Sequence, residues 1–72
     1  MGKYVLVKCV QIGDAMDDMT IGNIYAGYLP EQGEIDVSGL EVQYDDEIWV
    51  WKDDIGDEVI TTLSDGLVVV SE

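Results

Sequence analysis

Three observations predict an all-β fold for this chain of 72 residues. Residues 48–62 consist of two runs of β-branched and aromatic residues on either side of an acidic turn that contains Gly56, which is the pattern of a β-hairpin. Other apolar runs alternate with a period of two and end at Gly or Pro, as strands do. No window shows the period of 3.6 residues that a helix requires. We therefore expect one domain of about five strands that spans residues 1–72.

The central hairpin predicts its own pairing. If residues 53–56 form the connection, Val50 lies opposite Val59 and Trp49 lies opposite Ile60. Side chains directly opposite each other share a face of the sheet, and neighbours along a strand point to opposite faces. The two faces of the hairpin are therefore different sets of residues.

Both faces of this hairpin are apolar. One face is expected to carry Ile48, Val50 and Val59, and the other Trp49, Trp51 and Ile60. We expect the first set to face the core and the two Trp to face outward, where exposed Trp is enriched at interface hot spots. The opposite assignment would make both Trp core residues, and an outward pair would also suit self-association.

The elements before the hairpin follow in chain order. Residues 3–11 form a strand that is apolar on both faces, as expected of a strand that sits centrally or crosses between layers. Residues 12–20 form a polar loop whose methionines are expected to pack back onto the core. Residues 23–29 form a second strand, and Pro30 ends it. Residues 34–44 allow a small extra hairpin, which we favour, or a long ordered loop.

The chain ends with a short turn and one more strand. Residues 63–66 suit a single 3₁₀ turn that Gly66 closes. Residues 67–70 are an unbroken apolar run and are expected to form the last strand.

The order of these elements resembles the SH3-like small β-barrels found among short, mostly uncharacterised phage proteins. The resemblance rests on residues 8–10, 19–25, 53–58 and 63–70, which close or open strands in the positions that this fold uses. It departs between residues 31 and 47, which are longer than a compact version needs. The resemblance implies an SH3-like barrel of about five strands with room for one extra hairpin, and it implies little about activity, because this fold hosts many functions.

Peptide-binding SH3 domains present an aromatic groove to Pro-rich ligands. The aromatic residues that could build such a groove here are Trp49, Trp51, Tyr25, Tyr28 and Tyr44. The Pro-Asn-Tyr-like motif expected near the C-terminus is absent, so recognition of polyproline is not favoured.

Charge is the most unusual property of the composition. Sixteen Asp and Glu stand against three Lys and no Arg, which gives a formal net charge of −13. Direct binding of nucleic acid is excluded because phosphate contacts require Lys and Arg, and an anionic membrane is disfavoured for the same reason. A basic protein partner is the natural inference. The alternative is an acidity that serves only solubility.

The few reactive residues argue against an enzyme. The chain has no His and a single cysteine, Cys9, which lies in an apolar run and is expected to be a small buried hydrophobe. Nothing is present to activate a nucleophile, and the acids are expected to be solvated. One cysteine also allows no internal disulfide, which suits a reducing compartment. With neither a signal peptide nor an apolar stretch long enough to span a membrane, we expect a cytoplasmic protein, in the host cytoplasm if a phage encodes it.

Acidic side chains spaced along strands and turns can present a charge density comparable to that of nucleic-acid phosphates. We expect partner binding to involve Trp49, Trp51, Asp45, Asp46, Glu47, Asp53, Asp54, Asp57 and Glu58. The Trp pair would supply an apolar anchor and the acids the attraction. No cofactor or metal site is predicted, because the acidic turns do not match an EF-hand loop and no Cys/His set exists for zinc.

The sequence therefore predicts a non-enzymatic accessory protein of phage type. It would bind a basic, nucleic-acid-binding host protein and inhibit or redirect it. In the most specific form of this hypothesis, the carboxylates mimic the phosphates of nucleic acid. The alternative is a structural or assembly component that forms a homo-oligomer.

Overall fold

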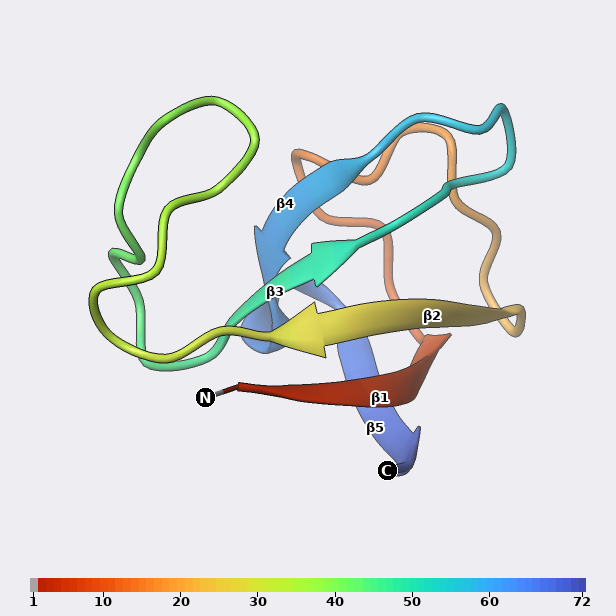
Figure 1. The fold of residues 1–72 in the computed structure, drawn as a ribbon. Helices are drawn as coiled ribbons and strands as arrows, with labels where there is room; N and C mark the ends of the chain where they lie inside the picture. Colours follow the sequence, from red (N-terminus) through yellow and green to blue (C-terminus); the bar gives the residue numbers. More distant parts are fainter. Residues whose placement is uncertain (1) are drawn as a thin grey trace.

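The computed structural model describes residues 2–72 and consists of one antiparallel sheet (Figure 1). Its elements are β1 (Lys3–Cys9), β2 (Ile24–Leu29), β3 (Glu47–Val50), β4 (Val59–Thr62), the 3₁₀ turn η1 (Leu63–Asp65) and β5 (Leu67–Ser71). The all-β prediction with five strands is confirmed. The strands are one or two residues shorter than predicted at several ends, because strand propensity continues into residues that turn away from the ladder.

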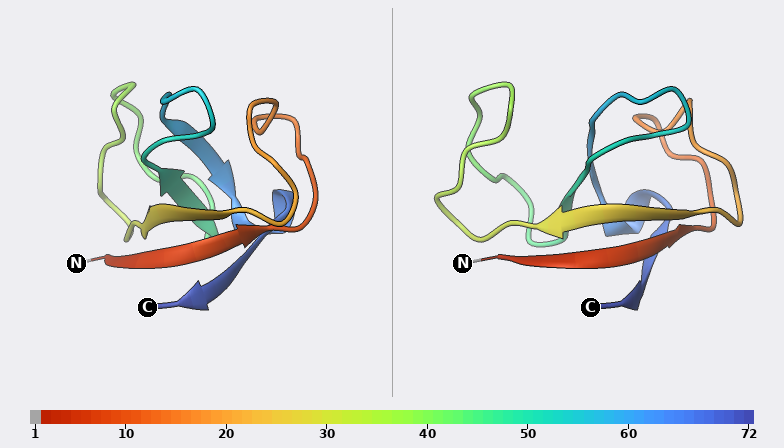
Figure 2. Two further views of the ribbon diagram at one scale, coloured as in Figure 1. Left: turned by 90° about the vertical axis from the view of Figure 1, so that its right-hand side faces the viewer. Right: turned by 45° about the vertical axis from the view of Figure 1, so that its right-hand side comes forward.

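The strand order in the sheet is β4-β3-β2-β1-β5. Strands β1 to β4 follow one another as a meander, and β5 returns through η1 to pair with the free side of β1. Figure 2 shows that β3 and β4 rise away from the plane of β1 and β2, so the sheet is strongly curled. The strand order and the curl of the sheet are consistent with a small barrel-like fold. The sheet does not close, because its edge strands β4 and β5 do not pair with each other.

The hairpin of β3 and β4 has the predicted register. Val50 pairs with Val59 and Trp49 pairs with Ile60. Its turn closes at Gly56, whose φ of +89° belongs to the left-handed region that Gly adopts without strain. The pairing follows from the positions of the apolar residues and of this Gly, which is why the sequence predicted it.

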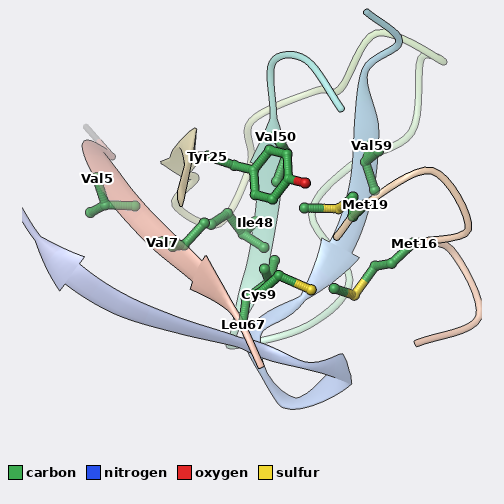
Figure 3. Packing of buried hydrophobic residues seen from close by; sticks show 10 residues of the cluster. All are labelled: Val5, Val7, Cys9, Met16, Met19, Tyr25, Ile48, Val50, Val59 and Leu67. Carbon is green, nitrogen blue, oxygen red and sulfur yellow. The ribbon is translucent and has the colours of Figure 1, made fainter. Parts of the chain in front are cut away.

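The core lies on the concave side of the curled sheet (Figure 3). Its buried members are Val5, Val7, Cys9, Met16, Met19, Tyr25, Ile48, Val50, Val59 and Leu67. The predicted faces of the hairpin are therefore confirmed, as are the burial of Cys9 and the return of the two methionines from their polar loop. Removing a side chain of this size from water contributes about 1.5–3 kcal/mol.

Residues 30–46 form a long loop, and the predicted extra hairpin is reduced to a single bridge between Ile35 and Glu41. The tip turns at Gly39, and the Asp36 carboxylate accepts hydrogen bonds from the backbone N–H of Ser38 and of Leu40, at 2.9 and 3.1 Å. These local bonds compete with a regular ladder, which is the usual effect of Asp in a turn. In Figure 1 this loop projects from the sheet beside β3 and β4.

The predicted 3₁₀ turn and last strand are both confirmed. Gly66 follows η1 with a φ of +147°, and its carbonyl oxygen accepts hydrogen bonds from the N–H of Val10 and Gln11. A Cβ at this position would overlap the Gln11 carbonyl oxygen. Gly66 is therefore required both for the turn and for the close approach of the two chain segments.

Candidate protein-binding groove

A row of aromatic side chains crosses the outer face of the sheet, on the side opposite the core. Tyr4 pairs with Tyr28 and Tyr28 pairs with Trp49, so one aromatic residue from each of β1, β2 and β3 lies on the same rung. The ring centroids are 5.0 Å apart for Tyr4 and Tyr28 and 5.6 Å apart for Tyr28 and Trp49. Trp51 stacks on Tyr4 with a centroid distance of 5.1 Å. We call Tyr4, Tyr28, Trp49 and Trp51 the aromatic row.

The aromatic row is open to solvent at one end and partly covered at the other. Tyr4 is 62% exposed and Trp51 is 48% exposed, whereas Tyr28 and Trp49 are half-buried. Both Trp lie outside the core, as predicted. Contacts of this kind between rings add about 0.5–1.5 kcal/mol for each pair, which holds an exposed set of rings in a fixed arrangement.

A groove of about 340 Å³ lies between the aromatic row, the β3–β4 hairpin and the long loop. Its lining residues are Tyr4, Tyr28, Glu34, Val37, Trp49, Val50, Trp51, Glu58, Val59 and Ile60. The lining is mostly apolar, with one carboxylate from the long loop and one from the hairpin. No Lys among residues 2–72 lines the groove, and the chain contains no Arg.

Glu34 ties the long loop to the aromatic row. Its carboxylate accepts hydrogen bonds from the Tyr28 hydroxyl at 2.7 Å and from the Glu31 N–H at 2.6 Å. The bond from the Glu31 N–H is the main reason that the Glu34 pKa lies below its usual value, and the Tyr28 hydroxyl lowers it further. The same contact with Glu34 raises the pKa of Tyr28. Glu34 is therefore ionised at neutral pH and contributes a fixed negative charge to the groove.

Glu47 orients Trp49 and does not belong to the solvent-exposed surface. It is buried, and its carboxylate accepts hydrogen bonds from the Trp49 indole N–H at 2.7 Å and from the Gln43 N–H at 3.1 Å. We therefore leave Glu47 out of the acidic surface that the sequence predicted. Its position in an acidic run of the sequence gave no sign of this burial.

Of the two predicted acids just before β3, one has a structural role and the other is exposed. Asp46 accepts a hydrogen bond from the Ser64 N–H at 2.9 Å, and this bond is the main cause of its lowered pKa. Asp46 thus fixes the start of η1. Its neighbour Asp45 is exposed.

Two acids of the hairpin turn are structural. Asp53 accepts hydrogen bonds from the N–H of Ile55 and of Asp57 at 3.0 and 2.9 Å, which is an Asx-type turn. The Asp54 carboxylate accepts hydrogen bonds from the Thr20 hydroxyl at 2.6 Å and from the Tyr25 hydroxyl at 2.7 Å. The hydrogen bond from the Thr20 hydroxyl is the main reason that the pKa of Asp54 lies below its usual value, and the bond from the Tyr25 hydroxyl lowers it further.

The predicted acidic cluster is therefore not one continuous surface. Asp46 and Asp53 lie at opposite ends of the β3 segment, seven positions apart, which corresponds to roughly 20 Å along an extended strand. Asp57 and Glu58 are exposed at the turn, and of the seven predicted acids only Glu58 lines the groove.

The sequence interpretation missed several residues of the groove, namely Tyr4, Glu34, Val37 and Ile60 as binding residues. The signal for Tyr4 and Ile60 was present, because both alternate with core positions, Ile60 on β4 beside the Trp strand and Tyr4 on β1, which pairs with β2. Placing them on one rung requires the register between β1, β2 and β3, which the sequence does not give. Tyr25 and Tyr44, which we considered for an aromatic groove, lie apart from it, and Tyr25 is buried.

Within residues 2–72, no group of three or more His, Cys, Asp or Glu side chains is arranged to hold a metal ion. None of the helical segments in the same range has the length and apolar character needed to cross a membrane.

Comparison with known protein families, with curated proteins and with solved structures found no match for this chain.

Proposed function

We propose that this protein is a non-enzymatic accessory protein that binds a basic protein partner through the aromatic row and the adjoining groove. The observation that carries this proposal is the row itself, three Tyr and Trp rings on three neighbouring strands and the Trp51 ring directly after β3, at the mouth of a groove. Tyr and Trp are the residues most enriched at interface hot spots, because they bury a large area at a small cost in side-chain entropy.

Charge supports a basic partner. Glu34 and Glu58 place carboxylates in the groove, and the whole chain carries a formal net charge of −13. Such a field accelerates encounter with a cationic surface and repels acidic competitors. Occupying a surface that a basic protein uses for nucleic acid would inhibit that protein. A continuous row of phosphate-like carboxylates is not needed for this effect.

The test is affinity capture from a cell lysate with the full chain and two variants. Replacing Tyr4 and Trp51 with Ala removes the exposed half of the aromatic row, whereas Tyr44→Ala removes an equally exposed ring outside the groove. We expect the wild type and Tyr44→Ala to retain the same basic protein and to release it as salt rises, because screening weakens attraction between exposed charges. The double variant should not retain it.

The proposal is refuted if the double variant, shown to be folded by its far-ultraviolet circular dichroism, retains the partner as well as the wild type. It is also refuted if the retained protein is acidic or its release does not depend on salt.

Self-association is a second candidate, and a different surface favours it. Leu6 on β1 and Val68 and Val70 on the edge strand β5 are exposed, and neither strand contains a carboxylate. Exposed apolar edges are sites of further strand pairing. Sedimentation velocity distinguishes the two candidates, since two chains of charge −13 repel each other less as salt rises. A dimer that forms at high salt and disappears in Val68→Asp would support self-association, and a monomer throughout would exclude it.

A further inference from the structure

We propose that the groove recognises arginine, so that an extended segment of the partner inserts an arginine side chain between the aromatic row and Glu58. This inference rests on the proposed function and names the chemistry that the groove selects.

The size of the groove suits side chains and not a folded element. Its volume of about 340 Å³ is at the lower end of the range of pockets that hold small ligands. Val37 and Ile60 offer apolar contacts for an aliphatic stem, and the rings of Tyr4 and Trp51 offer aromatic contacts beside them. An arginine side chain combines both needs, because its methylene stem is apolar and its planar guanidinium stacks on aromatic faces.

The two carboxylates of the groove differ in how much they are already used. Glu34 accepts hydrogen bonds at both of its oxygens. Glu58 is exposed, and its carboxylate makes no hydrogen bond or ion pair within residues 2–72, so both of its carboxylate oxygens are available. A carboxylate with two available oxygens matches the fork of a guanidinium, which donates two parallel hydrogen bonds. Lysine offers a compact and strongly hydrated charge that matches this arrangement less well.

The composition of the chain excludes a second copy as the source of the arginine. The sequence contains three Lys and no Arg, so the occupant belongs to another protein. An acidic segment would meet Glu34 and Glu58 as like charges, and a polyproline segment would leave the Glu58 carboxylate without a partner. Charge and aromatic contacts therefore favour a cationic segment with arginine.

The test uses three short synthetic peptides that differ only in one type of residue: arginine, lysine or citrulline at two positions separated by Gly. Each is titrated into the ¹⁵N-labelled full chain, and the two Trp indole N–H signals report on the groove. We expect the arginine peptide to shift the Trp51 signal at the lowest concentration. Citrulline keeps the shape but loses the charge, so its affinity should be about tenfold lower.

Matched variants locate the contact. Glu58→Gln should weaken binding of the arginine peptide about two- to fivefold, as expected for an exposed ion pair at its upper range. Trp51→Ala should weaken it by a similar factor through loss of the cation–π contact. Glu41→Gln removes the same charge from an exposed position outside the groove and should leave affinity unchanged within error.

Equal affinity for the arginine and lysine peptides overturns this inference, and so does an equal effect of Glu58→Gln and Glu41→Gln, which would indicate only long-range attraction. If capture of a basic partner depends on Trp51 while the peptides show no preference for arginine, the proposed function stands and this inference fails. If the arginine preference is found but no partner depends on the aromatic row, the inference stands and the proposed function fails.

Discussion

Replacing Ile48 with Ala is expected to destabilise the protein by about 3–4 kcal/mol. Ile48 is fully buried in the core, and truncation of such a residue removes its transfer free energy and leaves a cavity, with typical total costs of about 2–5 kcal/mol. The structure argues for the middle of this range or above. The Ile48 side chain lies over Gly27, where an added Cβ would be 3.0 Å from its Cδ1, so no side chain at Gly27 can fill the space.

The control has the same chemistry on the other face of the sheet. Ile24 is 50% exposed on β2, and Ile24→Ala should cost less than about 1 kcal/mol, because surface substitutions seldom exceed this. Both substitutions replace a β-branched residue with Ala in a strand, so the propensity for the extended backbone changes equally. The difference between the two variants isolates burial.

Thermal unfolding followed by circular dichroism measures both effects. For a domain of this size, 1 kcal/mol corresponds to about 4–8 °C, so Ile48→Ala should lower Tm by about 12–30 °C and Ile24→Ala by a few degrees. The total stability of such a domain is about 4–11 kcal/mol, so Ile48→Ala leaves little margin. Equal shifts for the two variants would mean that the assignment of the two faces is wrong.

Three further predictions follow from the polar contacts and the turns. The pKa of Asp54 in the folded protein lies below its usual value of 3.8, so ionised Asp54 contributes fully to stability above that value and loses this contribution as pH falls through the lowered pKa. In urea unfolding, the difference in free energy of unfolding between wild type and Asp54→Asn should be constant above about pH 5 and should disappear as pH falls below 3.8. Glu47→Gln puts an amide where two donors need acceptors, so it should lower stability by about 1–3 kcal/mol in the same assay and shift the indole N–H signal of Trp49, and an unchanged signal would contradict the contact. Gly66→Ala adds backbone overlap to strain, whereas Gly39→Ala (φ +88°) meets no atom within 4 Å, so Gly66→Ala should lower Tm far more, and similar values would refute the close approach at Gly66.

The sequence predicted the elements that depend on local pattern. The hairpin register follows from the spacing of Val50 and Val59 around Gly56, and the closing turn follows from Gly66. In each case the apolar period and a Gly with positive φ agree, and no distant residue is needed to decide the outcome. The burial of Met16 was expected because the methionines are the apolar residues of an otherwise polar loop that could pack back onto the core.

The groove depends on contacts between distant segments and could be predicted only in part. Trp51 was expected to face outward, but its neighbour Tyr4 is 47 positions earlier and meets it only through the pairing of β1 with β2 and of β2 with β3. The role of Glu34 likewise depends on where residues 30–46 turn. That loop contains a single bridge and no ladder, so the alternation of residues 34–44, which suggested a hairpin, does not give its path.

The distribution of acids explains how the chain combines a strong negative charge with an exposed apolar and aromatic surface. Of the 16 acidic residues, only Glu47 lies within a strand, and it is buried; the others lie in loops, in η1 or at the C-terminal end. Several of those in loops hold turns together, and this role keeps most carboxylates at the ends of strands. The faces of the sheet therefore carry mostly apolar and aromatic side chains.

In the proposed complex, this separation would give the two groups of residues different roles. Charges in the loops act over a Debye length of about 8–10 Å and set the rate of encounter, whereas Tyr4 and Trp51 make contacts only after docking and set the rate of release. Loop acids such as Asp45 should therefore affect association and its salt dependence, while the aromatic row affects dissociation. A partner that met only the acids would bind fast and leave fast. The groove is what allows the proposed complex to persist, and for this reason we base the function on the aromatic row and not on the number of carboxylates.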